Sequence, residues 1–579
     1  MSRRPIACLS RSLRYRPVLA TVRTQSTRVP YNAIPENPED PIEQKFTGYF
    51  RRLQYENRMK ELDDTRRPKD DKRKKLRSKA SVRVGESTDD ILQTDVERLI
   101  NDIQKSKAEN DSAEETITKA TLPSPFSEIE VTVSTISSTG DGLALSEDGS
   151  HVFVVPFTIA GDKALVKVVR HQRGTRYSIT DLIKVIHAGP ERDDSQIKCQ
   201  YFGQCSGCQL QMLPYEKQLE HKRRIVEKAY ANFSGLIPEL VPKIKDTFPS
   251  PLQYGYRTKL TPHFALFSGR ARKESSEPAK KMEVPPIGFN IKNRRTNMDI
   301  EDCPLGTDIV RKFLKKERKQ VAENIDSYTD GATILLREST HRIKKEDWKP
   351  KDSESSDIII TKEHPDYIEE KTCVTDPNGY SVEYIDDYVL GNKAGAFFQN
   401  NNSILSGFTE YIRQQVHSKA LKEGEKPIKY LIDAYSGCGL FTVTLSNVFK
   451  SSLGIDIDGN SILCARDNAK KNNLPNTGFA AADASLLFNR VPYPADETFL
   501  VIDPPRKGCS EDFLRQLLDY GPRRVAYVSC NVHTQARDIG YLVQGNASSD
   551  VRYEIESIRG FDFFPQTGHV EGLAILNKV

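Results

Sequence analysis

The sequence lacks any apolar run close to the length of a membrane span. A transmembrane helix needs about 20 consecutive apolar residues, and no such stretch occurs in the 579 residues. Cysteine is also sparse, with ten residues in the whole chain, which is too few for a disulfide scaffold. We therefore expect a soluble protein of a reducing compartment, with no membrane partner and no evident obligate protein partner.

Charge of one sign is not in excess either. The chain has 85 Lys and Arg against 80 Asp and Glu, a net charge of +5, so global charge says little about partners. Acidic residues are absent before Glu36, however, and residues 1–35 carry seven arginines among serines and threonines. This composition is typical of a mitochondrial transit peptide, although a basic disordered tail would look the same. We expect a mitochondrial protein, with a nuclear or cytoplasmic share left open.

Residues 36–120 are highly charged and low in aromatic side chains after Tyr55. Such a segment buries too little apolar surface to fold, so it predicts a disordered linker with a transient helix near Asp89 to Lys105. The dense basic run Arg66 to Lys79 suits a nuclear signal or an RNA-binding arm, and equally a solvated linker.

Short β segments separated by glycines fill residues 121–188. They alternate or run apolar, which predicts a small all-β barrel. The segments are Ile129 to Ser134, His151 to Val155, Lys163 to Val169 and Ser178 to Ile186. Basic residues gather near one hairpin, at Lys167, Arg170, His171, Arg173 and Arg176. They suit a nucleic-acid backbone, although a solvated hairpin explains them as well.

Three of the few cysteines, Cys199, Cys205 and Cys208, lie within ten residues. They can wrap one inorganic centre, and we expect Cys303, which precedes a proline, to be the fourth ligand. Structural zinc and Fe–S clusters both accept four thiolates. The spacing departs from the paired C-x2-C of zinc ribbons, so it favours a [4Fe–4S] cluster in a central α+β domain, residues 189–393. Charged segments 271–283 and 338–358 are expected to be surface insertions of that domain.

A strand, a glycine turn and a helix open the last region, residues 394–579. The run Asp433-Ala-Tyr-Ser-Gly437-Cys-Gly439 follows an apolar strand, and further strands end at Asp456 and Asp483. This order predicts a Rossmann-like, doubly wound α/β domain, in which the glycines let the backbone approach a nucleotide-type cofactor.

The third glycine of a dinucleotide site is missing, because Thr442 occupies its position. A pyrophosphate site is weakened by this change, whereas S-adenosylmethionine has no phosphate and needs none. Asp456, 19 residues after Gly437, would bind the ribose, and Asp483 would suit the adenine edge. Together these residues favour S-adenosylmethionine over NAD.

An acid and a thiol follow two further strands of this domain. The run Phe499 to Ile502 ends in Asp503-Pro-Pro-Arg506, and Val525 to Val528 ends at Ser529 and Cys530. Ligands of open α/β sheets bind at the carboxyl ends of the strands. A thiol beside a methyl donor indicates methylation at carbon. C5 of a pyrimidine becomes nucleophilic only after a thiolate adds to C6, and a base must then remove the C5 proton.

The base is expected downstream, in the segment Gly560 to Glu571. His569 and Glu571 are two residues apart and would point the same way in an extended segment. Proton removal suits Glu571.

With these residues assembled, the chain resembles the RNA uracil-C5 methyltransferase family, which includes tRNA T-loop enzymes and Fe–S-containing ribosomal-RNA enzymes. The resemblance covers about residues 123–579. The matching motifs are F-x-Q-x-N at Phe397 to Asn401, DAYSGCG at Asp433 to Gly439, IDPPRKG at Ile502 to Gly508, SCN at Ser529 to Asn531 and FPQTGHVE at Phe564 to Glu571, with the cysteine array.

The resemblance implies a class I methyltransferase domain and a TRAM-like RNA-binding barrel. It implies that Cys530 is the nucleophile and Glu571 the proton acceptor. Cofactor contacts are implied for Gln399, Tyr435, Asp456 and Asp503, whereas Leu440 replaces an asparagine of some bacterial members. We expect the T arm of tRNA as the substrate, with a uridine that leaves its loop stack. Ribosomal RNA is the alternative, and an RNA-binding or tRNA-chaperone protein is another.

Overall fold

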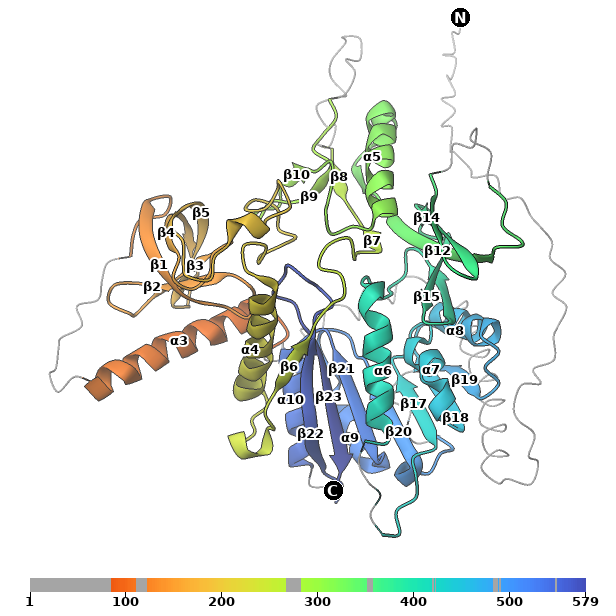
Figure 1. Cartoon of the computed structure of the whole chain (residues 1–579). Helices are drawn as coiled ribbons and strands as arrows, with labels where there is room; N and C mark the ends of the chain where they lie inside the picture. The colour runs from red at the N-terminus through yellow and green to blue at the C-terminus, as the bar shows by residue number, and fades with distance from the viewer. Residues whose placement is uncertain are drawn as a thin grey trace, which may run out of the picture.

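The computed structural model describes residues 85–110, 122–266, 283–350, 358–418, 421, 423–482, 488, 491–546 and 549–579. A barrel, a central α+β region and a large sheet flanked by helices lie next to one another (Figure 1). The expected transit peptide and the basic run Arg66 to Lys79 lie outside the described residues. Within those ranges, no helix has both the length and the apolar character that crossing a membrane requires.

Five strands close the barrel in the order β1-β2-β3-β5-β4, which confirms the β barrel expected from the sequence. The strands are β1 (Glu128–Ile136), β2 (Gly142–Leu145), β3 (Val152–Val155), β4 (Lys163–His171) and β5 (Tyr177–His187). Alternate side chains such as Val131, Val133, Val166 and Val168 fill its interior, as the period of two along a strand requires.

Helix α3 (Thr88–Asn110) lies where the charged linker was expected. Its buried side chains Leu92, Val96 and Ile100 pack on the barrel residues Leu143 and Val154. Four-residue spacing places these three side chains on one face of a helix, and that face is covered by the barrel. This segment is therefore ordered despite its charge, because its few apolar residues are aligned.

The central region contains two four-stranded sheets and helix α5 (Asp308–Glu323). One sheet has the order β10-β9-β8-β11 and the other β13-β14-β12-β7. Their strands are β7 (Lys259–Leu260), β8 (His263–Ala265), β9 (Gly288–Asn290), β10 (Asn297–Asp299), β11 (Gly331–Thr333), β12 (Leu336–Lys344), β13 (Ile360–Glu363) and β14 (Tyr367–Val374). A hairpin of β15 (Tyr380–Ile385) and β16 (Tyr388–Lys393) follows.

The expectation of a surface insertion over residues 338–358 is wrong for its first part. Residues 338–344 belong to β12 and pair with β14 in a continuous antiparallel register. Glu338, Ser339 and Thr340 are buried there. Their polar character concealed the strand, because cross-strand partners satisfy these groups, as Lys371 does for Glu338. Most of the other expected insertion, residues 271–282, lies outside the described residues.

The large sheet has eight strands in the order β19-β18-β17-β20-β21-β23-β22-β6. The strands are β17 (Tyr430–Ala434), β18 (Ser451–Asp456), β19 (Thr477–Ala481), β20 (Thr498–Ile502), β21 (Arg524–Ser529), β22 (Tyr553–Phe561), β23 (Glu571–Lys578) and β6 (Lys245–Phe248). Strands β17 to β21 are parallel, whereas β23 is antiparallel to β21. Strand β6 comes from the region expected to be the central domain.

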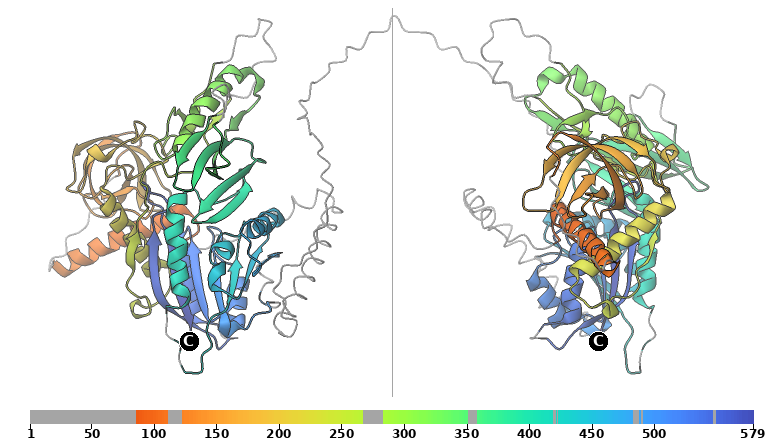
Figure 2. Two further views of the ribbon diagram at one scale, coloured as in Figure 1. Left: turned by 45° about the vertical axis from the view of Figure 1, so that its right-hand side comes forward. Right: turned by 90° about the vertical axis from the view of Figure 1, so that its left-hand side faces the viewer.

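Helices cover both faces of this sheet (Figure 2). One buried core combines it with α4 (Tyr215–Phe233), α9 (Glu511–Tyr520) and α10 (Val532–Gln544). The other core combines it with α6 (Leu405–Val416), α7 (Leu440–Thr444) and α8 (Gly459–Lys471). This layered arrangement is the doubly wound, Rossmann-like α/β fold that the strand and glycine pattern predicted.

Candidate active site

Register brings the expected functional residues to one edge of the large sheet. Ala434, at the end of β17, is aligned with Ile455 in β18 and Ile502 in β20. On the far side of β20, Ser529 of β21 is opposite Gly572 of β23. The residues immediately beyond these positions therefore meet at the same edge; they are Tyr435, Asp456, Asp503, Cys530 and Glu571.

The glycine turn after β17 is tied to the second strand by its backbone. Tyr435, Gly437 and Gly439 all have positive φ, at 64°, 53° and 89°, a conformation that favours glycine. The Gly437 N–H donates to Asp456 Oδ2 at 2.9 Å, and the Asp458 N–H donates to Oδ1 at 2.8 Å. Asp456 is thus oriented at the turn, where ribose hydroxyls would bind.

Thr442, in place of a third glycine, has a structural partner that the sequence did not reveal. Its N–H and Oγ1 donate to Asp433 Oδ2 at 2.9 and 2.6 Å. The other oxygen of Asp433 is buried without a partner among the described residues, and burial raises the pKa of this carboxyl to about 7. The threonine therefore fixes an acid at the end of β17.

Two of the expected cofactor residues are less well defined. Gln399 is 7% exposed, and its neighbour Asn401 donates to the carbonyl of Phe563 at 3.2 Å. This bond places the loop of Gln399 against the segment that leads to Glu571. Asp483 lies outside the described residues, so its assignment stays a prediction.

Cys530 and the carboxyls of Glu571 and Asp503 share one small volume. Burial and then the charges of Glu571 and Asp503 raise the pKa of the Cys530 thiol to about 12, whereas Arg506 opposes them through its charge and a hydrogen bond. Glu571 is 1% exposed, and neither of its carboxylate oxygens has a hydrogen-bond partner within the described ranges. Burial raises the pKa of Glu571, and the charge of Asp503 adds to this effect. Burial also raises the pKa of Asp503, to about 7.

Arg506 and Asn531 are site residues to which sequence reasoning gave no role. The Asn531 side chain donates to the Arg506 carbonyl at 3.0 Å and to the Gly85 carbonyl at 3.1 Å. It also accepts from the His533 N–H and caps helix α10. Asn531, the residue after Cys530, therefore joins three segments. The sequence did offer a signal for both residues, because Arg506 lies in the expected acid loop and Asn531 directly follows Cys530.

The expectation that His569 and Glu571 point the same way stays a prediction. The His569 side chain is exposed and Glu571 is buried, but the charge of Arg506 contributes to the lowered pKa of His569 and opposes the raised pKa of Glu571. Strand β23 begins only at Glu571, so His569 lies in the loop that precedes it.

The four expected metal ligands line one cavity, together with Tyr201, Arg257 and Asp302. These ligands are Cys199, Cys205, Cys208 and Cys303, and burial raises the pKa of each thiol. Backbone N–H groups of Tyr201 and Phe202 donate to Cys199. Across the described ranges, no group of three or more Cys, His, Asp or Glu side chains meets the geometry of a metal site.

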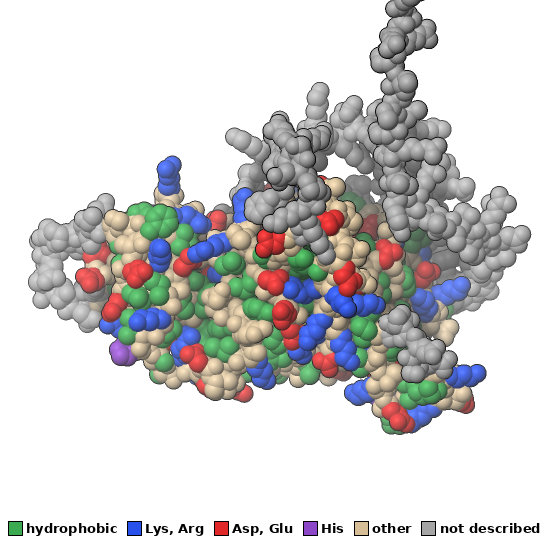
Figure 3. Space-filling view, turned by 90° about the horizontal axis from the view of Figure 1, so that it is seen from above, with side chains coloured by type: hydrophobic (Ala, Val, Ile, Leu, Met, Phe, Trp, Pro, Cys, Tyr) green, Lys and Arg blue, Asp and Glu red, His purple; other side chains and the backbone are tan. Residues whose placement is uncertain are grey.

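Two of the basic side chains near the barrel hairpin already have partners within the protein. Arg176 forms an ion pair with Glu97 of α3, and His171 is hydrogen-bonded to Ser178 at 2.7 Å. Elsewhere, basic and acidic side chains are interspersed over the face seen in Figure 3, as the nearly balanced composition suggests.

Comparison with known proteins agrees with this arrangement. The family model described as tRNA (Uracil-5-)-methyltransferase matches residues 366–579. The chain is 43% identical to the tRNA (uracil(54)-C(5))-methyltransferase of Schizosaccharomyces pombe, over 78% of this chain and 79% of the relative. It is 38% identical to the protein of that name from Saccharomyces cerevisiae, over 78% of this chain and 73% of the relative.

A solved structure shares the fold. The Pyrococcus abyssi tRNA (uracil-54, C5)-methyltransferase in complex with S-adenosyl-L-homocysteine has a TM-score of 0.51 and 22% identity, covering 77% of this chain and all of that chain. The sequence relatives carry the family assignment. Identity of this extent over most of both chains shows that the chain belongs to the tRNA (uracil-5-)-methyltransferase family.

Proposed function

We propose that this protein methylates C5 of the uridine at position 54, in the T loop of tRNA, with S-adenosylmethionine as the methyl donor. As a family member it is a tRNA uracil-C5 methyltransferase. Position 54 is the one named for the fungal relatives. One observation carries the mechanism: Cys530 and Glu571 lie close together at one edge of the large sheet. The strands on either side of the glycine turn end at the same edge.

Cys530 is the nucleophile in this proposal. Its sulfur adds to C6 of the uracil, which gives C5 the electron density needed to take the methyl group. The thiol must lose its proton first, and Arg506 is the group that favours the thiolate. Asp503 and Glu571 disfavour it, so RNA binding has to change this balance.

Glu571 removes the C5 proton in the second half of the reaction. The electrons of the C5–H bond re-form the C5–C6 double bond, and the bond between C6 and the Cys530 sulfur breaks. A carboxyl whose pKa is raised by burial is a stronger base than a solvated one and suits this task.

S-adenosylmethionine would supply the methyl group from its sulfonium centre. Asp456, Gly437 and Gly439 would hold its nucleoside, with Gln399, Tyr435 and Asp503 around the amino-acid portion and the reacting carbon. Asp483 is proposed for the adenine edge on the sequence pattern alone. The positive φ angles of the turn support this assignment, because they allow close backbone approach.

A [4Fe–4S] cluster is proposed for the cavity lined by Cys199, Cys205, Cys208 and Cys303. The donor set fits, because four thiols face one cavity and backbone N–H groups donate to Cys199 and Cys303, as is usual around cluster sulfurs. Methyl transfer involves no redox change, so we assign the cluster a structural role. Iron and sulfide analysis of anaerobically purified protein, with zinc measured alongside, tests this assignment.

We further propose that the barrel is TRAM-like and contacts RNA, and that residues 1–35 direct the protein to mitochondria. The first proposal is supported by Lys167 and Arg170 on β4. Imaging of the full chain with and without residues 1–35 tests the second.

The decisive experiment incubates the protein with methyl-labelled S-adenosylmethionine and either a tRNA or a ribosomal-RNA fragment. We expect 5-methyluridine in the T loop of tRNA, and a loss of at least about 1,000-fold in Cys530→Ala. Label only in ribosomal RNA would overturn the substrate but keep the reaction. Unchanged activity in the variant would overturn the nucleophile.

A further inference from the structure

The position of Glu571 is not fixed by its own side chain. Both carboxylate oxygens are buried without a hydrogen-bond partner in the part of the chain that the structure describes. Only the backbone can therefore hold this group near Cys530. Strand β23 starts at Glu571 itself, and residues 562–570 connect it to β22. What anchors this loop also sets the carboxylate.

An ion pair between helix α4 and the first residue of the loop anchors the start of the loop. Lys222 and Asp562 form an ion pair in which both side chains are 0% exposed. The Lys222 ammonium also donates to the Phe564 carbonyl at 2.9 Å. The Tyr215 hydroxyl donates to the second oxygen of Asp562 at 2.8 Å. A buried lysine with these contacts fixes the loop strongly, because losing any partner would leave a buried charge uncompensated.

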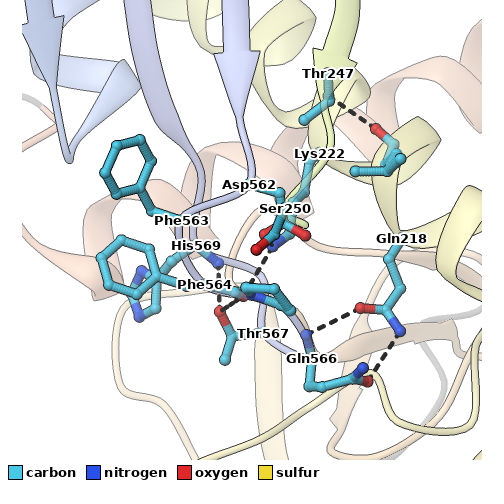
Figure 4. Close-up of polar contacts among 12 residues, drawn as sticks. Gln218, Lys222, Thr247, Ser250, Asp562, Phe563, Phe564, Gln566, Thr567 and His569 are labelled. Carbon is cyan, nitrogen blue, oxygen red and sulfur yellow. Dashed lines mark hydrogen bonds and ion pairs between the residues drawn. The ribbon is translucent and has the colours of Figure 1, made fainter. Parts of the chain in front are cut away.

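A pair of glutamines anchors the middle of the loop (Figure 4). The Gln566 N–H donates to Gln218 Oε1 at 3.0 Å, and Gln218 Nε2 donates to Gln566 Oε1 at 3.0 Å. Gln218 Nε2 also donates to the carbonyls of Leu210 and Leu213. Gln566 has a φ of 70°, which is unfavourable for a residue with a side chain. Such a conformation persists only where neighbours over-determine it.

The same helix also reaches the thiol side of the site. Tyr230 of α4 donates to Gln535 of α10 at 3.3 Å. Gln535 in turn donates to the carbonyl of Gly572, the residue after Glu571, at 3.1 Å. Helix α4 therefore contacts the helix that follows Cys530 and, through Gln535, is linked to the strand that begins with Glu571.

We propose that Lys222 and Gln218 are positioning residues that set Glu571 for removal of the C5 proton. This inference rests on the proposed roles of Cys530 and Glu571. Loosening the loop would leave Cys530, which directly follows β21, able to add to C6 and the methyl group able to reach C5. Only the last step would slow, in which Glu571 takes the proton and the bond between C6 and sulfur breaks. The methylated RNA would then stay attached to Cys530.

The test follows full-length protein through a single turnover with a tRNA transcript and methyl-labelled S-adenosylmethionine. A denaturing gel measures the labelled protein–RNA adduct, and digestion measures free 5-methyluridine. The variants are Gln218→Met, Lys222→Met, and Lys222→Met combined with Asp562→Asn, which removes both buried charges. Lys217→Met is the matched control, because Lys217 lies on the same helix but its side chain is 37% exposed. Glu571→Gln and Cys530→Ala mark full and absent adduct accumulation.

We expect the Lys222 and Gln218 variants to accumulate labelled adduct and to release product at least about tenfold more slowly, while the adduct forms within about threefold of the normal rate. The Lys217 variant should match the unmodified protein. Folded variants that turn over slowly without adduct would overturn the proposal. If Lys222→Met does not fold, Gln218→Met decides, since it removes no charge. If Glu571→Gln itself gives no adduct, the proposed role of Glu571 fails instead.

Discussion

Two carboxylates at the same edge of the large sheet have opposite surroundings. Asp456, beside the glycine turn, accepts backbone N–H donors on both oxygens. Glu571, beside the thiol, has no hydrogen-bond partner within the described ranges, and burial raises its pKa. A satisfied carboxylate is held in one place, which suits binding. An unsatisfied one binds a proton readily, which suits proton transfer. The difference separates a binding half from a chemical half.

The binding half is tested by Asp456→Asn. We expect affinity for S-adenosylhomocysteine, measured by calorimetry without RNA, to fall by about 10- to 100-fold, since a hydrogen bond to a charged group contributes about 1.5 to 3 kcal/mol. Asp467→Asn, on the exposed face of α8, is the control and should leave affinity unchanged. Equal affinity in both variants would show that Asp456 does not bind the ribose, and the division into two halves would fail.

The contrast also shows what the sequence could predict. The strands, the glycine turn and the order of Asp456, Asp503 and Cys530 follow from short-range patterns, because apolar runs ending in acids or glycines specify a parallel sheet edge. The pairing of Cys530 with Glu571 required one more step, the chemical argument that methylation at C5 needs a base beside the thiol, and the resemblance to a family agrees with it. His569 lies in the loop before strand β23, and that loop is held by side chains rather than by strand pairing, so its shape could not be predicted from alternation along the sequence.

Contacts between segments far apart in the chain could not be predicted from the sequence. Strand β6 and helix α4, residues 215–248, complete the large sheet and its core, although the sequence places them in the central domain. Their partners lie more than 300 residues away, as in the bond between Tyr215 and Asp562. Helix α3 presents the same difficulty, because only the barrel surface explains why a charged segment is ordered.

The thiol side is tested by Arg506→Gln. Burial raises the pKa of Cys530 to about 12 while Arg506 opposes it, so at pH 7 to 9 the thiolate fraction should rise about tenfold per pH unit. Removing the guanidinium raises the pKa further. The rate of Cys530 alkylation, followed by mass spectrometry without RNA, should therefore fall by up to about tenfold at each pH.

Lys507→Gln is the matched control, since Lys507 is exposed beside Arg506 but does not contribute to the shift in the Cys530 pKa. Identical alkylation rates in both variants would show that the arginine does not act on the thiol. Its role would then be confined to RNA.

The last expected effect is on stability, and its sign distinguishes a carboxylate without a partner from one that has a partner. The pKa of Glu571 is raised in the folded protein, so its contribution to the free energy of unfolding is present below about pH 4 and is lost as pH rises. Glu571→Gln should therefore be more stable than the unmodified protein at pH 8, by a gap that grows by up to about 1.4 kcal/mol per pH unit from about pH 5.

The opposite sign is expected for a satisfied carboxylate. Glu497 accepts from Lys429 at 2.7 Å, and this hydrogen bond lowers its pKa. Its contribution is present above about pH 4 and is lost below it, so Glu497→Gln should be less stable at pH 8, with a gap that closes in acid. Urea unfolding of both variants from about pH 3 to pH 8 measures the two slopes. Slopes of the same sign would mean that Glu571 has a partner in solution, and the division into binding and chemical halves would fail.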